Sequence, residues 1–221
     1  MKNQTVEKLW NIMICLGLAG LVVLFSMLYG MFLITAQEGS GHGYSGIEIG
    51  ALCFFCLFTS FFMLRLSKGL KLFSFDLSFL TKKNLKIIFI GTVLALGILI
   101  AETILINQNI LIEQAGNPRT MAVLSKAPSL VIGLFTFILA PIMEEVLFRG
   151  GIIGLVFADK QLLGVFVSSL VYCLAFRPDG IIYWLLSLMM NIILGLAYVQ
   201  TKRLEVPIII KMLTLLLMLL F

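Results

Sequence analysis

The chain has 221 residues, of which 61% are hydrophobic and only 12% are charged, and its mean hydropathy is +1.11. A soluble domain is roughly half apolar and a quarter charged, so this composition excludes soluble enzymes, disordered tails and secreted disulfide scaffolds. The net charge of +5 does not indicate nucleic-acid binding, because the basic residues are scattered between apolar runs and form no basic face. The sequence therefore predicts an all-α fold, a polytopic transmembrane helical bundle.

Seven apolar runs are candidates for membrane-spanning helices, each of which needs about 20 residues. In chain order they are residues 9–36, 47–64, 87–107, 128–148, 162–176, 181–201 and 206–221. The second, fifth and seventh runs are short, and residues 150–158 are expected to extend a neighbouring helix or to lie at the membrane interface. We expect one structural domain of about seven spans, with N-terminal transmembrane helices over residues 1–127 and core helices over residues 128–221.

The lysines and arginines are distributed unevenly between the two sides of these runs. With the N-terminus in the cytoplasm, twelve of the 16 fall inside and three outside, and Lys211 lies within the last run. This asymmetry follows the positive-inside rule, so we predict a multi-pass protein of the cell membrane with a cytoplasmic N-terminus. Phenylalanines and leucines interleaved with lysines over residues 68–86 predict an amphipathic cytoplasmic connection that contacts anionic membrane lipids.

Cysteine and histidine give no sign of a metal site. All four cysteines lie in apolar runs, where they are expected to act as small buried hydrophobic residues. Cys53 and Cys56 form a C-x-x-C pattern, but no polar partner ligands accompany them, so neither a metal nor a redox role is expected. The single histidine, His42, lies in a Gly/Ser-rich stretch predicted to be on the outer face, where an ordinary loop residue is expected. We predict no cofactor.

Ionisable side chains gather in the fourth run, where Glu144 and Glu145 follow an uncharged stretch and precede Arg149. A charged residue in a spanning helix costs about 2.5–3.5 kcal/mol on insertion scales, so it needs a partner or a function. On a helix Glu145 and Arg149 are i and i+4 and can pair, while Glu144 is rotated by about 100° towards another helix or an aqueous pocket. Such unequal surroundings suit a general base and the residue that orients it. The alternative is a helix end with interfacial charges.

The string Glu144-Glu145-x-x-x-Arg149, followed by two glycines, resembles the first motif of the CPBP intramembrane proteases. This family includes the CAAX prenyl-protein endopeptidases and the bacterial Abi or bacteriocin-immunity proteins. Residues 168–178 resemble its second motif region and residues 194–208 the stretch before its last motif, so the likeness covers about residues 128–215. The resemblance implies a membrane-embedded, glutamate-dependent endopeptidase site at Glu144, Glu145 and Arg149.

Typical catalytic members of that family carry two motif histidines, and this chain has neither of them. The resemblance puts Tyr172 and Phe176 at the aromatic and histidine positions of the second motif, and Lys211 at the histidine position of the last motif. A catalytic zinc takes three protein ligands, so no metal site is expected beside the two carboxylates. If Lys211 reaches them, two acids and two cations cancel in formal charge, and the cations weaken the acids as bases.

Three functions remain open. The favoured one is non-hydrolytic: an ion pair from Glu144 or Glu145 to Lys211 joins the fourth and last runs. The protein would then keep a cavity that binds a membrane peptide, as in bacteriocin immunity. Alternatively, it would bind a polytopic membrane protein such as a sensor kinase and regulate that partner. The second is an active endopeptidase in which one glutamate activates water and Tyr172, Asn191 or Lys211 substitutes for histidine. The third is a channel or a purely structural membrane protein. No nucleic-acid partner is expected.

Overall fold

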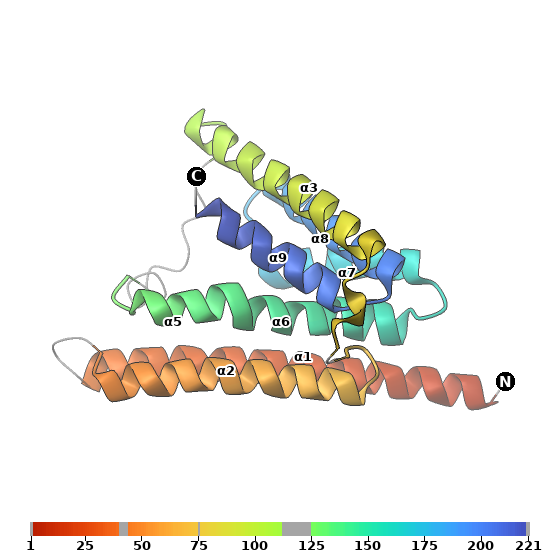
Figure 1. The fold of residues 1–221 in the computed structure, drawn as a ribbon, viewed down its shortest axis with the longest axis horizontal. Coiled ribbons are helices and arrows are strands. Elements are labelled where there is room, and N and C mark those ends of the chain that lie inside the picture. The colour runs from red at the N-terminus through yellow and green to blue at the C-terminus, as the bar shows by residue number, and fades with distance from the viewer. Residues whose placement is uncertain (1, 40–43, 75, 112–124, 220–221) are drawn as a thin grey trace.

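A computed structural model describes residues 2–39, 44–74, 76–111 and 125–219, and over these ranges the chain is a bundle of helices (Figure 1). The elements are α1 (Lys2–Gly39), α2 (Gly46–Gly69), the 3-10 turn η1 (Leu77–Phe79), α3 (Lys82–Asn107), α5 (Ser129–Leu134), η2 (Phe135–Leu139), α6 (Ala140–Glu145), η3 (Val146–Val156), α7 (Gln161–Phe176), α8 (Ile181–Thr201) and α9 (Glu205–Met218). The predicted all-α membrane bundle is confirmed.

Five helices in the described ranges are long and apolar enough to cross a membrane: Thr5–Ala36, Gly46–Gly69, Lys82–Asn107, Ser129–Val156 and Ile181–Thr201. Two more are shorter, since α7 has 16 residues and α9 has 14. Each of the seven predicted runs corresponds to a helix, but the second run is not short, because α2 has 24 residues. The cytoplasmic position of the N-terminus stays a prediction.

The fourth run does not end at Phe148, because η2 and η3 are π-helices that continue α5 and α6 into one helix from Ser129 to Val156. Residues 150–156 therefore extend this helix, which was one of the two expectations for them. Glu144 and Glu145 lie near its middle, whereas the cluster was expected at the end of the span. Pro141 has no backbone N–H and interrupts the regular hydrogen bonding of a helix, and the wide turn η2 directly precedes this part of the chain. Wide π turns within helices occur frequently at functional sites.

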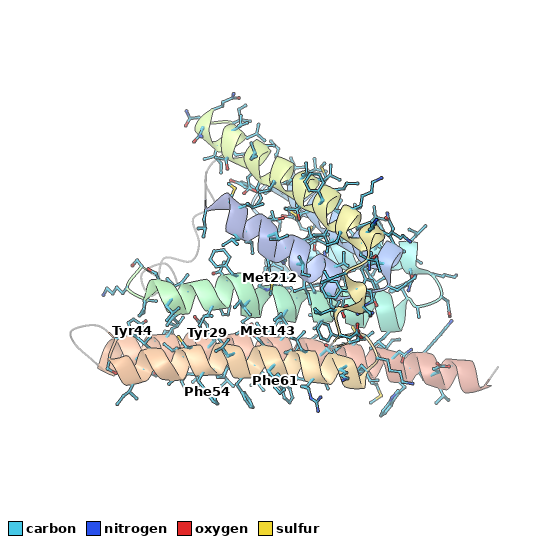
Figure 2. All side chains as sticks on the ribbon, in the orientation of Figure 1. Tyr29, Tyr44, Phe54, Phe61, Met143 and Met212 are labelled. Carbon is cyan, nitrogen blue, oxygen red and sulfur yellow. The ribbon has the colours of Figure 1, made fainter. Side chains whose placement is uncertain are left out.

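The helices form layers around this long central helix. α1 and α2 lie antiparallel in one layer, and α3, α8 and α9 lie on the opposite side of the helix that runs from α5 to η3 (Figure 1). Tyr29 and Met143 are buried between the first layer and the central helix, whereas Phe54 and Phe61 are exposed and point away from the bundle (Figure 2). The carboxylates of the central helix therefore face inward, between the two layers.

Several glycines of the described helices permit very close contacts, Gly91 and Gly154 among them. A Cβ atom on Gly91 of α3 would lie 2.6 Å from Ile210 Cδ1 of α9, and a Cβ atom on Gly154 of η3 would lie 2.5 Å from the Tyr198 hydroxyl. Both distances are far shorter than van der Waals contact. Because Ile210 directly precedes Lys211, the packing of α3 on α9 sets the position of Lys211.

We expect Gly91→Leu to destabilise the protein in detergent, because the new side chain overlaps Ile210. Overpacking of this kind costs about 1–3 kcal/mol. Gly97→Leu is a matched control in the same helix, since no atom lies within 4 Å of a Cβ placed there, and its unfolding temperature should stay at the wild-type value. Equal losses in the two variants would contradict the close contact between α3 and α9.

The predicted amphipathic connection over residues 68–86 is not one helix. α2 continues to Gly69, and α3 begins at Lys82 with Thr81 as its N-cap, whose side chain accepts from the Asn84 N–H. Lys68 therefore lies at the end of α2 and Lys82, Lys83 and Lys86 in the first turns of α3, whereas Lys71 follows α2 in a turn. Only the part between the two helices forms an extended segment with the short turn η1.

Arg203 ties this segment to the turn between α8 and α9. Its guanidinium donates to Ser74 Oγ at 2.6 Å, to Asp76 Oδ1 at 3.0 Å and to Glu205 Oε1 at 3.0 Å. Hydrogen bonds from Ser78 and from Arg203 lower the pKa of the exposed Asp76 carboxyl. The ionised form of Asp76 is therefore the one that the folded protein favours.

This network predicts a dependence of stability on pH. An acid whose pKa is lowered by folding stabilises the folded state above its unfolded pKa and loses this effect as the pH falls towards its folded pKa. We expect the difference in melting temperature between wild type and Asp76→Asn to be constant above about pH 5 and to shrink below about pH 4. Thermal unfolding at stepped pH measures it. A difference that grows on acidification would contradict the network.

Candidate active site

Four charged side chains meet in the middle of the bundle: Glu144 and Glu145 of α6, Arg149 of η3 and Lys211 of α9. The predicted pair within the central helix is confirmed, since Arg149 Nε lies 3.0 Å from Glu145 Oε2. Glu144 forms its ion pair with Lys211, whose Nζ also lies 4.0 Å from Glu145 Oε1. The two neighbouring acids thus have different partners, as the rotation between successive helical residues requires.

The two ion pairs differ in burial. The side chains of Glu145 and Arg149 are 0% and 1% exposed, whereas those of Glu144 and Lys211 are 14% and 17% exposed. Removing a charge from water costs several kcal/mol per ion, which only a well-placed partner offsets. The inner pair therefore depends fully on its protein partners, and the outer pair remains within reach of a ligand or solvent.

Asn191 of α8 holds Arg149 from a second side. Arg149 Nη2 donates to Asn191 Oδ1 at 2.8 Å and to the Asn191 carbonyl oxygen at 3.1 Å. Asn191 Nδ2 donates in turn to the Ser187 carbonyl at 2.9 Å, so the amide oxygen is the atom that faces Arg149. Asn191 was expected as one possible substitute for histidine, but its hydrogen-bond partners are Arg149 and the α8 backbone. Arg149 Nη1 has no hydrogen-bond partner among the described residues.

Aromatic rings form the outer wall of the cluster. Lys211 Nζ lies 5.4 Å from the centroid of the Tyr172 ring, within the range of a cation–π interaction. The Tyr172 ring stacks on Phe176 at 4.3 Å and meets Phe148 edge-on at 5.0 Å. Phe176 is 54% exposed, so it forms the rim of the site.

Two residues that shape this wall, Phe148 and Ser168, were not predicted from the sequence. Phe148 contributes a ring to it, and buried Ser168 donates to the Phe148 carbonyl at 2.9 Å. A spacing of four residues, from Glu144 to Phe148 and from Ser168 to Tyr172, puts each on the same helix face as a predicted site residue. From this spacing Phe148 and Ser168 could have been predicted as residues of the site.

In the described ranges, no group of three or more His, Cys, Asp or Glu side chains could hold a metal ion. Cys53 and Cys56 of α2 are free thiols, the second of them buried. His42, the one histidine, lies outside the described residues.

Comparison with known proteins agrees with the resemblance in the motifs. Residues 126–217 match the Rce1-like family of type II CAAX prenyl endopeptidases. The membrane-embedded CAAX protease MroQ of Staphylococcus aureus (strain USA300) is 36% identical to this chain over 108 residues. Over residues 126–217 the chain is thus similar to the membrane proteins of the CPBP family.

The aligned part covers 45% of this chain and 43% of MroQ, so the chain spans less than half the length of that relative. No solved structure matches the chain significantly. The family match includes all four charged residues of the cluster, together with Tyr172, Phe176 and Asn191. It does not reach α1, α2 or α3, which pack around this core.

Proposed function

We propose that this protein is a non-hydrolytic CPBP member that binds a membrane peptide or a transmembrane segment of a partner protein. The observation that carries the proposal is the ion pair between Lys211 and Glu144. By its motif position, Lys211 stands where typical members have a histidine. It brings a fixed positive charge to a site that otherwise holds two acids and one arginine.

The charges of this site argue against hydrolysis. A general base must lie within hydrogen-bond reach of the water that it deprotonates, and a carboxylate oxygen that is paired with a cation is not free to accept from that water. Glu145 faces Arg149 at 3.0 Å and Lys211 at 4.0 Å, and Glu144 is paired with Lys211 directly. Phe176 supplies an apolar ring where a second histidine would position the water.

The same groups are suited to binding. The exposed ring of Phe176 continues the aromatic wall formed with Tyr172, which gives apolar side chains a surface to pack on. Bound in this way, a membrane-active peptide would be sequestered, which is the chemistry of bacteriocin immunity. A transmembrane segment of a sensor kinase bound at the same rim would instead change the state of that kinase.

Photo-crosslinking in the native membrane tests the proposal. A photoreactive phenylalanine analogue placed at Phe176 keeps an aromatic ring at the rim, and the same analogue at Phe61, which is exposed on α2, is the matched control. We expect the Phe176 position to capture a peptide or membrane protein of intact length that the Phe61 position does not capture. Mass spectrometry identifies the captured species and both of its ends.

Two results would contradict this function. Capture of fragments that end at a new terminus would favour the active endopeptidase, in which one glutamate still activates water. Identical captures at Phe176 and Phe61 would show that the rim selects no ligand. If the Glu144→Gln variant still captures the full-length species, binding does not depend on catalysis by this carboxylate.

A further inference from the structure

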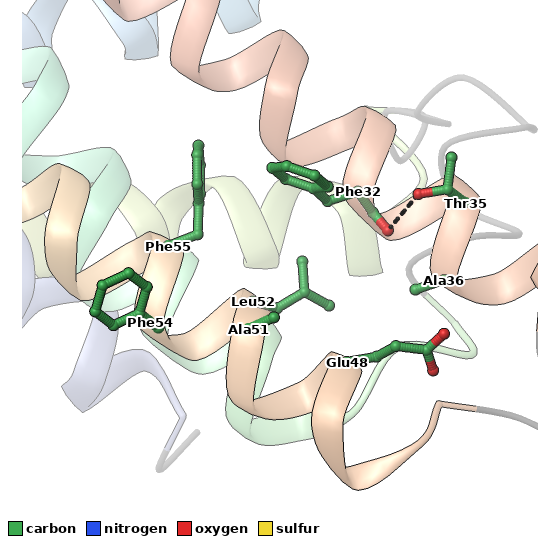
Figure 3. A pocket seen from close by; sticks show the side chains of 8 residues that line it. All are labelled: Phe32, Thr35, Ala36, Glu48, Ala51, Leu52, Phe54 and Phe55. Carbon is green, nitrogen blue, oxygen red and sulfur yellow. Dashed lines mark hydrogen bonds between the residues drawn. The ribbon is translucent and has the colours of Figure 1, made fainter.

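A hollow that is lined by none of the four charged cluster residues lies between α1 and α2, at the end of these helices that is opposite the connection over residues 68–86 (Figure 3). Its volume is about 390 Å³, within the range of roughly 300–1,000 Å³ for small-ligand pockets. The walls are mainly apolar, with Phe32 and Ala36 from α1 and Ala51, Leu52 and Phe55 from α2. Glu48 stands at one end of the hollow, beside Ala36 (Figure 3).

The wall of this hollow is held in place by aromatic contacts. The Phe55 ring meets Phe25 at 6.2 Å, Tyr29 at 6.4 Å and Phe32 at 5.5 Å between ring centroids. Tyr29 is anchored in turn, because its hydroxyl donates to the Val131 carbonyl at 3.1 Å. A ligand would therefore meet a surface that is already formed, and little ordering of side chains would oppose binding.

Glu48 brings a fixed negative charge to one end of the hollow. It is the third residue of α2, and its Oε2 accepts from the Ser45 N–H at 2.7 Å while Ser45 Oγ accepts from the Glu48 N–H. This capping box holds the carboxylate in position, and the side chain is only half-buried, so a ligand can reach it. Among the residues that the structure describes, none of those that line the hollow is basic. An apolar surface with a carboxylate at one end complements an amphiphile with a cationic head.

We propose that this hollow binds a lipid whose headgroup carries an ammonium group. Its acyl chain packs on Phe32 and Phe55, and its ammonium lies beside Glu48. A lipid is the fitting occupant because the flanking rings of Phe32 and Phe54 are 48% and 69% exposed on apolar helices, where the bilayer surrounds the protein. The site is independent of the proposed function, since none of its residues belongs to the charged cluster.

Native mass spectrometry of the detergent-solubilised protein tests the site with phosphatidylethanolamine and phosphatidylglycerol of identical acyl chains. We expect the first bound phosphatidylethanolamine to bind roughly 3- to 10-fold more tightly than phosphatidylglycerol. Glu48→Gln keeps the capping box, because glutamine also serves at this position, and should make the two affinities equal. Ala51→Trp fills the hollow at an exposed position and should weaken both lipids. Phe61→Ala, elsewhere on α2, should keep the wild-type preference.

Equal affinities in the wild type, or a preference that survives in Glu48→Gln, would overturn the proposal. Tighter binding of a lysine-containing apolar peptide than of phosphatidylethanolamine to the same hollow would also overturn it and point to a peptide site. If Ala51→Trp lowers the melting temperature, its effect on lipid binding could come from partial unfolding. Thr35→Phe then replaces it, since it fills the hollow from α1 and should also weaken the binding of both lipids.

Discussion

Lys211→Met is expected to destabilise the protein by about 3 kcal/mol, the lower end of the cost of breaking a buried ion pair. The variant leaves Glu144 without its cation, and it removes the second cation that lies near the fully buried Glu145. The loss should not exceed this by much, since the Glu144 and Lys211 side chains keep 14% and 17% exposure. Chemical or thermal unfolding in detergent measures it, with Lys86→Met at an exposed position of α3 as the control.

The double variant Lys211→Met with Glu144→Gln separates the ion pair from simple loss of packing. Replacing both members of a buried pair with neutral groups removes the uncompensated charge and is often neutral or stabilising. We therefore expect the second substitution to restore most of the stability lost in Lys211→Met. If the double variant is as unstable as Lys211→Met or less stable, the ion pair between α6 and α9 does not account for the loss.

Arg149→Met is expected to have the largest effect in the chain, about 3–5 kcal/mol or more. Arg149 is 1% exposed and is the partner of Glu145, which is 0% exposed. Its loss leaves that carboxylate without its nearest cation and two oxygens of Asn191 without their donor. The yield of folded protein and its unfolding temperature measure the effect.

Two further variants define what Arg149 contributes. Arg149→Lys keeps the charge but lacks the planar fork that contacts Glu145 and Asn191 together, so an intermediate loss is expected. Arg149→Met with Glu145→Gln should be more stable than Arg149→Met alone. Wild-type stability of Arg149→Lys would contradict a role for the hydrogen bonds to Asn191.

The sequence predicted the parts of this site that depend on local geometry. The spacing of Glu145 and Arg149 predicted their pair, and the angle between adjacent helical residues predicted that Glu144 would face a different partner. The approach of Lys211 to these acids could not come from spacing, because 67 residues separate it from Glu144. The motif resemblance predicted it, and the structure places the two side chains in contact.

The sequence did not predict the features that depend on tertiary packing. The fourth span was expected to stop at Phe148, because a charged residue and two glycines follow it. In the structure these glycines give room to the segment after α2 and to α1: a Cβ on Gly150 would lie 3.0 Å from Leu72 Cδ1, and one on Gly151 would lie 3.1 Å from Cys15 Sγ. Arg203 and Asp76 were likewise missed as partners, because they are 127 residues apart and only the folded chain brings them together.

The central claim is that Lys211 neutralises the carboxylates and leaves a site that binds without hydrolysis. Comparison of all new protein termini in cells that express wild type or the Glu144→Gln, Glu145→Gln variant tests it without knowledge of the ligand. The account predicts the same set of termini in both, at equal levels of the two proteins in the membrane. Termini that occur with wild type and disappear with the variant would show that the glutamates catalyse cleavage, and would contradict it.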